Sequence, residues 1–211
     1  AFGSIVGLNR NVDVDTASQI SKTFVEAVIA PGFDEEALKI LMKKPSIRLI
    51  KLPNIYAENT KQVFRFVSGG ILVQTPDNRK VEVKDLLCVT KTKVKPIIQN
   101  DLLFAFVIVK HVKSNAIVVV KNGQLLGVGA GQMSRIDATE IALKKADKKA
   151  KGAVLASDAF FPFKDSVELA ATVGISAIIQ PGGSKRDQES IDACNENNIS
   201  MVTTGVRHFK H

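Results

Sequence analysis

The second half of the chain alternates apolar runs of strand length with stretches of helical periodicity, and this alternation constrains the fold more than any other feature of the sequence. Two strand-like runs, 116–121 and 124–128, flank Asn122-Gly123, a dipeptide typical of tight β-hairpins. Further along, we predict helices and strands in alternation: helix 132–149, strand 152–157, helix 165–173, strand 176–180, helix 185–197 and strand 200–203. This order predicts an α/β fold of three layers, with helices on both faces of a sheet.

The first half also mixes strands and helices, but less regularly. We predict the following elements here: strands 4–9, 24–30 and 47–52, and helices 16–22 and 35–44 with Asp15 and Asp34 as their N-caps. Between residues 62 and 90, β-rich pieces that include Val81-Glu82-Val83 are separated by Gly69-Gly70 and Pro76-Asp77-Asn78. This pattern predicts a β-rich antiparallel excursion at a sheet edge. Pro96 separates it from a helix predicted at 99–113.

The composition is that of a globular protein rather than a membrane or secreted one. With 45% hydrophobic and 24% charged residues, the 211-residue chain can bury a substantial core, and it has no apolar run of about 18 residues that would predict a membrane span. Cys88 and Cys194 lack C-x-x-C spacing, so we expect two small buried residues, no zinc site and a reducing cytoplasm. Ala1 stands directly before an apolar run, from which we expect further sequence upstream.

The net charge of +8 suggests an anionic partner such as nucleic acid, a nucleotide phosphate or a polyglutamate tail. The alternative is that the lysines only solvate helix faces. Dedicated RNA-binding signatures are missing, with one Tyr and no Trp, so we do not expect a nucleic-acid partner. The H-x-E and P-C-x-x-C motifs of zinc deaminases are missing as well, which excludes that chemistry.

Two loops in the second half combine features of ligand sites. Residues 127–135, Gly-Val-Gly-Ala-Gly-Gln-Met-Ser-Arg, join a strand to a helix, where glycines allow close backbone approach and free amides attract anions. This loop is either a ligand-binding turn or a tight structural turn. Residues 157–165 carry three Phe and a Pro after a strand, so a flat ring could stack there, with Asp165 accepting hydrogen bonds. The alternative is a hydrophobic plug with Asp165 as an N-cap.

Two further segments leave similar alternatives open. Gln180-Pro181-Gly182-Gly183-Ser184 leads from a strand to a helix, and Ser184 could contact a ligand or simply cap the helix. The terminal Arg207-His208-Phe209-Lys210-His211 could reach a phosphate or be an unconstrained end.

These four segments, taken with Lys113-Ser114-Asn115-Ala116 and with Phe2-Gly3 and 26–31 earlier in the chain, closely resemble in their order the AICAR transformylase domain usually fused to IMP cyclohydrolase. The resemblance spans nearly all of the chain. It implies a cytidine-deaminase-like three-layer α/β/α fold, duplicated within the domain. Residues 1–92 would be the latter part of the first copy with its β-rich edge excursion, and 93–211 the second copy.

The resemblance also implies the activity. A cytoplasmic, multifunctional transferase of purine (IMP) biosynthesis would pass a formyl group from 10-formyltetrahydrofolate, the co-substrate, to the 5-amino group of AICAR. No zinc is expected, and the implied assembly is a homodimer with active sites at the interface. An arylamine is a weak nucleophile, so such a site must hold the amine and formyl carbon together, remove a proton and stabilise an oxyanion.

Position by position, the resemblance implies two sets of binding residues. The AICAR set is Phe2, Gly3, Glu26, Asn115, Arg135, Phe160, Pro162 and Arg207, with Arg207 near the phosphate. The folate set is Ile136, Phe163, Asp165 and Ser184, with Asp165 pairing with the pterin edge. His211 and Asn115 are the implied catalytic residues, and no metal is implied.

The family's proton-transfer pair, a Lys-His dipeptide, precedes the Phe-Gly motif, so no residue of this sequence corresponds to it. Lys110-His111 is at a different position, and we expect it on a helix surface. The alternative to the formyltransferase is therefore a catalytically incomplete or non-catalytic basic module that binds a ligand or nucleic acid on the same scaffold.

Overall fold

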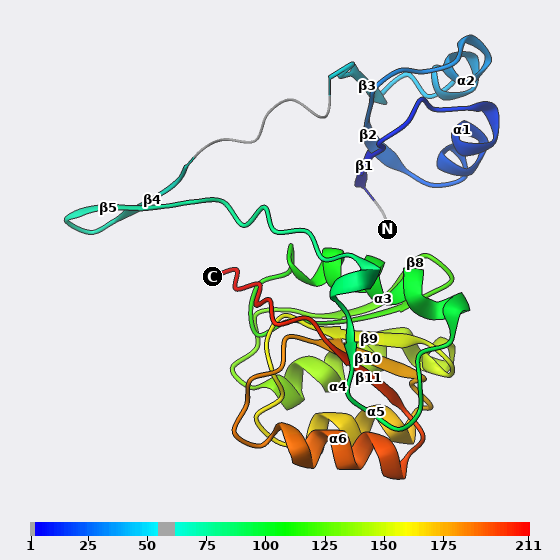
Figure 1. Cartoon of the computed structure of the whole chain (residues 1–211). Coiled ribbons are helices and arrows are strands. Elements are labelled where there is room, and N and C mark those ends of the chain that lie inside the picture. The colour runs from blue at the N-terminus through cyan, green and yellow to red at the C-terminus, as the bar shows by residue number, and fades with distance from the viewer. Residues whose placement is uncertain (1–2, 55–61) are drawn as a thin grey trace. The chain divides into compact units, whose positions relative to one another are not determined.

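The protein has an α/β fold with mixed sheets, in a computed structural model that describes residues 3–54 and 62–211 (Figure 1). The chain divides into two compact units, Ala1–Pro76 and Asp77–His211. The boundary predicted near residue 92 separates two copies of one fold, whereas the division at residue 76 separates compact units. The division into two copies stays a prediction. Among the described residues, no helix is long and apolar enough to cross a membrane.

The first unit contains a parallel three-stranded sheet of order β1-β2-β3 and two helices: β1 (Ser4–Gly7), α1 (Val14–Ser21), β2 (Val25–Ala30), α2 (Glu35–Leu41) and β3 (Arg48–Lys51). The helices pack on the sheet through a core that includes Ala17, Val28 and Leu41. The prediction of Asp15 as N-cap was wrong. Asp13 is the N-cap, because it accepts a hydrogen bond from the Thr16 amide at 2.8 Å, and α1 begins at the next residue, Val14. Asp34 is the N-cap residue of α2, but its side chain makes no capping bond.

The predicted antiparallel excursion is a hairpin of β4 (Val63–Val67) and β5 (Gly70–Gln74), but among the described residues it forms a separate two-stranded sheet rather than the edge of a larger one. Gly69 occupies the turn with a positive φ of 82°, a conformation that favours glycine. The strand expected at Val81-Glu82-Val83 is not formed. A short 3₁₀ helix, η1 (Val83–Asp85), takes its place because Glu82 and Asp85 cap each other's backbone amides.

The second unit is built on a six-stranded sheet of order β6-β11-β10-β9-β7-β8. Its strands are β6 (Leu87–Cys88), β7 (Ile117–Lys121), β8 (Gln124–Gly129), β9 (Val154–Ser157), β10 (Ala177–Gln180) and β11 (Ser200–Thr203). The three strands β9, β10 and β11 run parallel, whereas β6, β7 and β8 each join an antiparallel pair. The hairpin predicted at Asn122-Gly123 is confirmed between β7 and β8.

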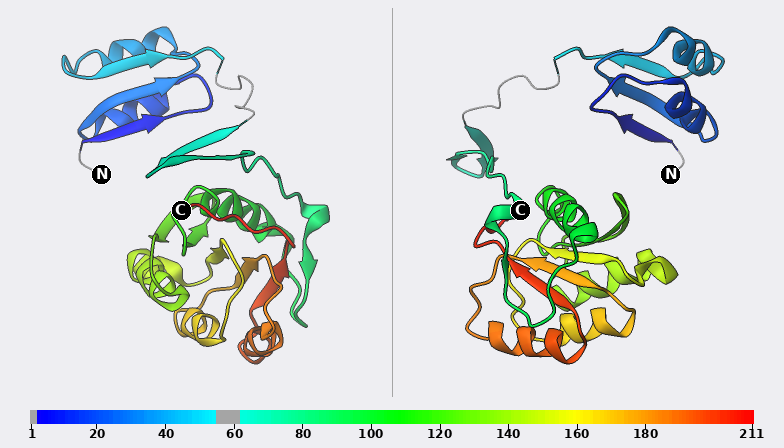
Figure 2. Two further views of the ribbon diagram at one scale, coloured as in Figure 1. Left: turned by 90° about the vertical axis from the view of Figure 1, so that its left-hand side faces the viewer. Right: turned by 45° about the vertical axis from the view of Figure 1, so that its right-hand side comes forward.

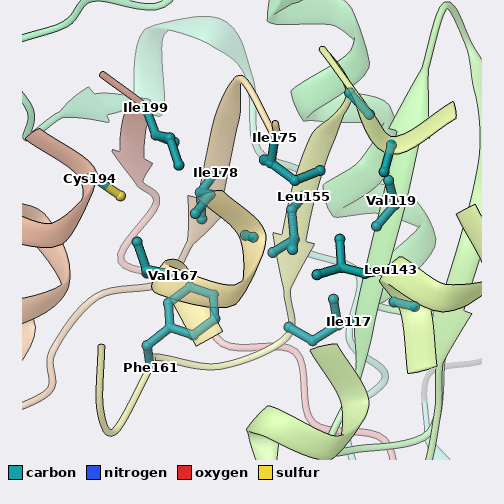
Figure 3. Close-up of a cluster of buried hydrophobic side chains, with 14 of the residues drawn as sticks. Ile117, Val119, Leu143, Leu155, Phe161, Val167, Ile175, Ile178, Cys194 and Ile199 are labelled. Atoms are coloured by element: carbon teal, nitrogen blue, oxygen red, sulfur yellow. The ribbon is translucent and has the colours of Figure 1, made fainter. Parts of the chain in front are cut away.

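Helices cover both faces of this sheet (Figures 1 and 2). On one face lies α3 (Pro96–Val109), and on the other lie α4 (Arg135–Ala146), continued by the 3₁₀ turn η2 (Asp147–Ala150), α5 (Asp165–Thr172) and α6 (Asp187–Glu196). Alternate strand residues supply the two cores: Val154 packs toward α3, and Leu155 packs toward α4 to α6 (Figure 3). This unit therefore has the predicted three layers.

Helices α3 and α4 each begin three residues away from the predicted start. Helix α3 begins at Pro96, three residues before the predicted start, because proline is well suited to the first helical position, where no amide donor is needed. Helix α4 begins at Arg135 rather than at residue 132, since the Ser134 side chain caps it by accepting a hydrogen bond from the Asp137 amide at 3.2 Å.

Candidate functional site

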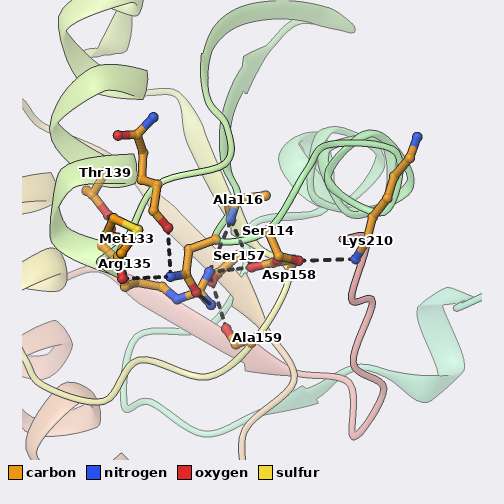
Figure 4. Close-up of polar contacts among 11 residues, drawn as sticks. Ser114, Ala116, Met133, Arg135, Thr139, Ser157, Asp158, Ala159 and Lys210 are labelled. Atoms are coloured by element: carbon orange, nitrogen blue, oxygen red, sulfur yellow. Dashed lines mark hydrogen bonds and ion pairs between the residues drawn. The ribbon is translucent and has the colours of Figure 1, made fainter. Parts of the chain in front are cut away.

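A buried ion pair between Asp158 and Arg135 forms the base of the site (Figure 4). Asp158 directly follows β9 and is fully buried, and Arg135 is the first residue of α4 with 7% of its surface exposed. The Asp158 carboxylate also accepts hydrogen bonds from the Ser114 hydroxyl at 2.5 Å and the Ala116 amide at 3.2 Å. Arg135 Nη1 donates to the Ser157 hydroxyl at 3.0 Å. The buried charges are thus paired and hydrogen-bonded, as burial requires.

Asn115 links the ion pair to the glycine-rich loop. Its Oδ1 accepts a hydrogen bond from Arg135 Nη2 at 2.9 Å, and its Nδ2 donates to the carbonyl oxygens of Gln132 at 3.0 Å and Met133 at 3.3 Å. Both predicted ligand contacts, Asn115 and Arg135, therefore have extensive hydrogen bonds within the protein. They hold the loop in place as well as facing the adjacent cavity.

A cavity of about 450 Å³ opens beside this base. It is lined by Asn115, Met133, Ser134, Arg135, Ile136, Ala159, Phe160, Pro162, Phe163, Asp165 and Phe209. The lining comes from the glycine-rich loop, the aromatic loop and the carboxyl-terminal segment. The structure thus brings together residues of both predicted sets: Asn115, Arg135, Phe160 and Pro162 from the AICAR set, and Ile136, Phe163 and Asp165 from the folate set.

Two arginines lie over the aromatic rings of the cavity. The Arg207 guanidinium carbon is 4.9 Å from the centre of the Phe160 ring, and that of Arg186 is 4.6 Å from the centre of the Phe163 ring. Arg186 is also paired with Glu189 at 2.6 Å, which raises the pKa of the guanidinium and lowers that of the carboxylate. Among the described residues, Arg207 has no carboxylate partner, so its positive charge is available to an anion.

Asp165 and Ser184 have local backbone roles. Asp165 is the first residue of α5 rather than its N-cap, and its Oδ1 accepts a hydrogen bond from the Ser166 amide at 2.6 Å. Ser184 does not line the cavity, and its hydroxyl accepts a hydrogen bond from the Arg186 amide at 3.1 Å. The predicted folate contact at Ser184 thus lies two residues from Arg186, which reaches Phe163.

The carboxyl-terminal segment is held in place and is not an unconstrained end. The His208 amide donates to the Asp158 carbonyl at 3.0 Å, and the Ser114 amide donates to the Lys210 carbonyl at 2.8 Å. The His211 ring stacks on Phe209, a cavity residue, with ring centres 5.7 Å apart. The predicted catalytic histidine therefore lies beside the cavity wall.

The remaining predicted AICAR contacts belong to the first unit. Gly3 and Glu26 are neighbours there, because a Cβ atom added to Gly3 would lie 3.3 Å from Glu26 Oε1. Gly3 has a φ of +70°, and its amide donates to the Phe24 carbonyl at 3.1 Å. Phe2 lies outside the described residues.

Sequence reasoning missed three residues that shape the site: Asp158, Phe209 and Arg186. The signal for Asp158 was present, since an acidic residue directly after the apolar run of β9 is placed at the carboxyl edge of the sheet. The positions of Phe209 and Arg186 depend on contacts with distant segments, which the sequence does not reveal. Within residues 3–54 and 62–211, no group of three or more His, Cys, Asp or Glu side chains could hold a metal ion.

Known proteins are similar to this chain in sequence. The family model described as "AICARFT/IMPCHase bienzyme" matches residues 1–145. The chain is similar to the bifunctional purine biosynthesis protein PurH of Oceanobacillus iheyensis, with 56% identity, and to that of Acetivibrio thermocellus, with 53% identity, each over 100% of this chain and 41% of the relative. The chain thus spans about two fifths of the length of these relatives.

Among solved structures, Acinetobacter baumannii RibD, form 2, is similar over 50% of this chain and 33% of its own, at 16% identity. Its TM-score of 0.35 is too low to indicate a shared fold.

Proposed function

The chain belongs to the AICARFT/IMPCHase bienzyme family, and on that premise we propose that it forms the part of an AICAR formyltransferase that binds AICAR and 10-formyltetrahydrofolate. One observation carries the proposal: a single cavity of about 450 Å³ is lined by residues of the AICAR set and of the folate set. A reaction between two bound molecules needs such a shared space, because the reacting atoms must meet at close to van der Waals distance.

The AICAR half of the proposal uses Phe160, Pro162 and Arg207. The imidazole ring packs against the apolar surface of Phe160 and Pro162, and the phosphate pairs with Arg207, which has no carboxylate partner among the described residues. Asn115 and Arg135 present polar edges toward the carboxamide of AICAR while they hold the loop through their own hydrogen bonds. In the first unit, Gly3 and Glu26 complete the proposed AICAR set together with Phe2.

The folate half uses Ile136, Phe163 and Asp165, with Ser184 nearby. The pterin ring packs against Ile136 and Phe163, both in the cavity wall. One carboxylate oxygen of Asp165 accepts from the Ser166 amide, and the other has no hydrogen-bond partner among the described residues, so it can accept from the N–H groups of the pterin edge.

The proposed chemistry forms a bond between the 5-amino nitrogen of AICAR and the formyl carbon. The bond from that carbon to N10 of the folate breaks, the amine loses a proton and N10 gains one, which leaves formyl-AICAR and tetrahydrofolate. His211 moves the proton, and Asn115 helps to hold the amine next to the formyl group. We assign no residue of this chain to the family's Lys-His pair.

The proposal extends to the fold and the assembly. We propose that residues 1–92 and 93–211 belong to two cytidine-deaminase-like copies and that the protein acts as a homodimer. The β4–β5 hairpin is consistent with a surface that binds a partner subunit. Four of its apolar side chains are each more than half exposed: Phe64, Phe66, Ile71 and Leu72. A two-stranded hairpin is only marginally stable in water unless another surface covers it.

Calorimetric titration of the full chain tests the two halves separately. For Asp165→Asn we expect a roughly ten- to hundredfold weaker affinity for 10-formyltetrahydrofolate, because a charged hydrogen bond contributes about 1.5–3 kcal/mol, with the affinity for AICAR unchanged. Glu168→Gln, one turn further along α5 at an exposed site, is the matched control. Equal folate affinity in both variants, or no folate binding to the unmodified chain, would contradict the assignment.

A further inference from the structure

A second cavity, of about 360 Å³, lies in the Asp77–His211 unit between α3 and the segment 79–82. It is lined by Arg79, Lys80, Val81, Glu82, Leu103, Phe106, Val107, Lys110, His111 and His208. It shares no lining residue with the first cavity. The proposed formyl transfer uses none of these side chains, so the cavity needs a separate explanation.

The floor of this cavity is apolar. Leu103, Phe106 and Val107 follow one another at helical spacing on one face of α3, and Val81 faces them from the other side. Val107 is 55% exposed, although it lies on a packed helix. A ligand with an apolar body would remove this surface from water, which is favourable in proportion to the area covered.

The rim of the cavity is basic. Lys110 is the C-cap residue of α3 and His111 follows it, so the pair lies just beyond the helix on whose surface it was predicted. Arg79 and Lys80 lie on the segment that crosses α3. Among the described residues, neither Arg79 nor Lys80 has a carboxylate partner. The rim therefore carries an excess of positive charge.

The two nearby carboxylates, Glu82 and Asp77, already have other partners. Glu82 pairs with Lys84 at 2.7 Å and also caps η1. Asp77 contacts His208 Nδ1 at 2.6 Å, and its other oxygen is 3.9 Å from Lys110 Nζ. Neither acid is therefore placed to neutralise the two cations of the crossing segment.

The protonation of His111 reports the same local charge. Burial lowers the pKa of the imidazole, and the positive charges of Lys110 and Lys210 lower it further. Asp77 acts in the opposite direction, and His208 in the same direction as the lysines. An anion bound in the cavity would oppose these neighbours and favour the protonated imidazole.

We propose that this second cavity is a binding site for a small organic anion, a phosphate or carboxylate attached to an apolar body of aromatic size. The body lies on Leu103, Phe106 and Val107, and the anionic head pairs with Arg79, Lys80 and Lys110. The volume is within the range of small-molecule sites. No side chain of this site takes part in the proposed formyl transfer.

The two cavities are connected through the carboxyl-terminal segment. His208 is 2% exposed, lines the second cavity and packs against Phe106 with ring centres 4.8 Å apart. Its neighbours on either side serve the first cavity, Arg207 over Phe160 and Phe209 in the wall. An anion that fixes His208 therefore acts on both neighbours, and any effect on the first site must be reciprocal.

The test is proton NMR of the full chain, whose three histidines give resolvable ring signals, with His111→Gln to assign that of His111. The probe is phenyl phosphate, which carries both a body and a head, and it is compared with inorganic phosphate and with benzyl alcohol. We expect phenyl phosphate to shift the His111 signal saturably and to raise the pH midpoint of the His111 titration. Inorganic phosphate and benzyl alcohol should each bind at least tenfold more weakly. Binding at the first cavity would move His211 instead.

A pair of double variants separates this site from general attraction to a basic protein. Arg79→Ala with Lys80→Ala should weaken phenyl phosphate binding at His111 at least tenfold. Lys144→Ala with Lys148→Ala, which removes the same charge from α4 and η2, should leave it within twofold. Three results would overturn the proposal: no saturable shift of His111 at millimolar phenyl phosphate, equal binding of inorganic phosphate, or equal weakening in both double variants.

Discussion

Asp158 and Arg135 show at the scale of single residues how the site is held. The pair is buried, and both partners are hydrogen-bonded to the segments that begin β7 and end β9. A buried charge whose partner is removed keeps the cost of leaving water without the compensating attraction. The stability of the second unit should therefore depend strongly on this pair.

Replacing Asp158 with Asn tests this dependence. We expect the free energy of unfolding to fall by about 3–5 kcal/mol, because Arg135 would stay buried without a counter-charge. Urea unfolding of the full chain measures the change, with hydrogen exchange of the β9 amides as the probe. Glu189→Gln removes a carboxylate from the exposed Arg186 pair and should leave the same amides unaffected. An Asp158→Asn protein as stable as the original would show that the pair contributes nothing.

Cys194 gives a second prediction at this scale. Burial raises the pKa of its thiol to about 12, and the side chain is fully buried in α6. At pH 8 roughly one part in 10⁴ would be thiolate, the reactive form. Alkylation of the native chain should therefore leave Cys194 unmodified, and alkylation in denaturant should modify it. Mass spectrometry of the peptides decides this, and fast native labelling of Cys194 would contradict the burial.

The sequence predicted which residues gather at the site better than it predicted what they contact. Seven predicted residues line one cavity, among them Phe160 and Asp165. The sequence could not reveal that Arg135 is paired with Asp158, 23 positions away, because partner choice depends on how β9 and α4 pack. Motifs locate loops, whereas hydrogen-bond partners depend on tertiary structure.

At the scale of elements, β8 and α4 pack closely at two glycines. Cβ atoms added to Gly127 and Gly129 would lie 1.9 Å from the carbonyl oxygens of Ala142 and Ala138. The helix can therefore approach this strand only because both positions lack a side chain. The glycine-rich run read as a ligand-binding or structural turn is thus in part a helix-packing surface, and it also positions Arg135 at the start of α4.

Gly129→Ala should force α4 away from β8. We expect the free energy of unfolding to fall by about 1–3 kcal/mol, because overpacking shifts the backbone. We also expect weaker ligand binding at the first cavity. Calorimetric melting of the full chain measures the first effect. Gly70→Ala, at a strand position with nothing within 4 Å, is the control and should not lower the melting temperature. A Gly129→Ala protein with unchanged melting would show that the contact is loose.

Elements were predicted more accurately than their ends. The strands β9, β10 and β11 are buried apolar runs, and the sequence predicted all three, since a central strand must be apolar on both faces. Helix ends depend on which of several candidates forms the cap, and Asp13 was chosen over Asp15. Local competition of this kind leaves only a weak signal in the pattern.

At the scale of the whole molecule, the proposed AICAR contacts are divided between the two units. Gly3 and Glu26 belong to Ala1–Pro76, and Arg135, Phe160 and Arg207 belong to Asp77–His211. Within the described part of the second unit, one cavity combines aromatic, apolar and charged groups of both predicted sets.

Hydrogen exchange of the full chain with and without AICAR tests this central claim most directly. We predict slower exchange in segments 133–136 and 159–163, which supply most of the lining of the first cavity, and unchanged exchange at 140–146 in the second half of α4. Phe160→Ala should abolish the slowing without unfolding the chain. Protection confined to other segments, or equal protection in the Phe160→Ala protein, would contradict the assignment of this cavity to AICAR.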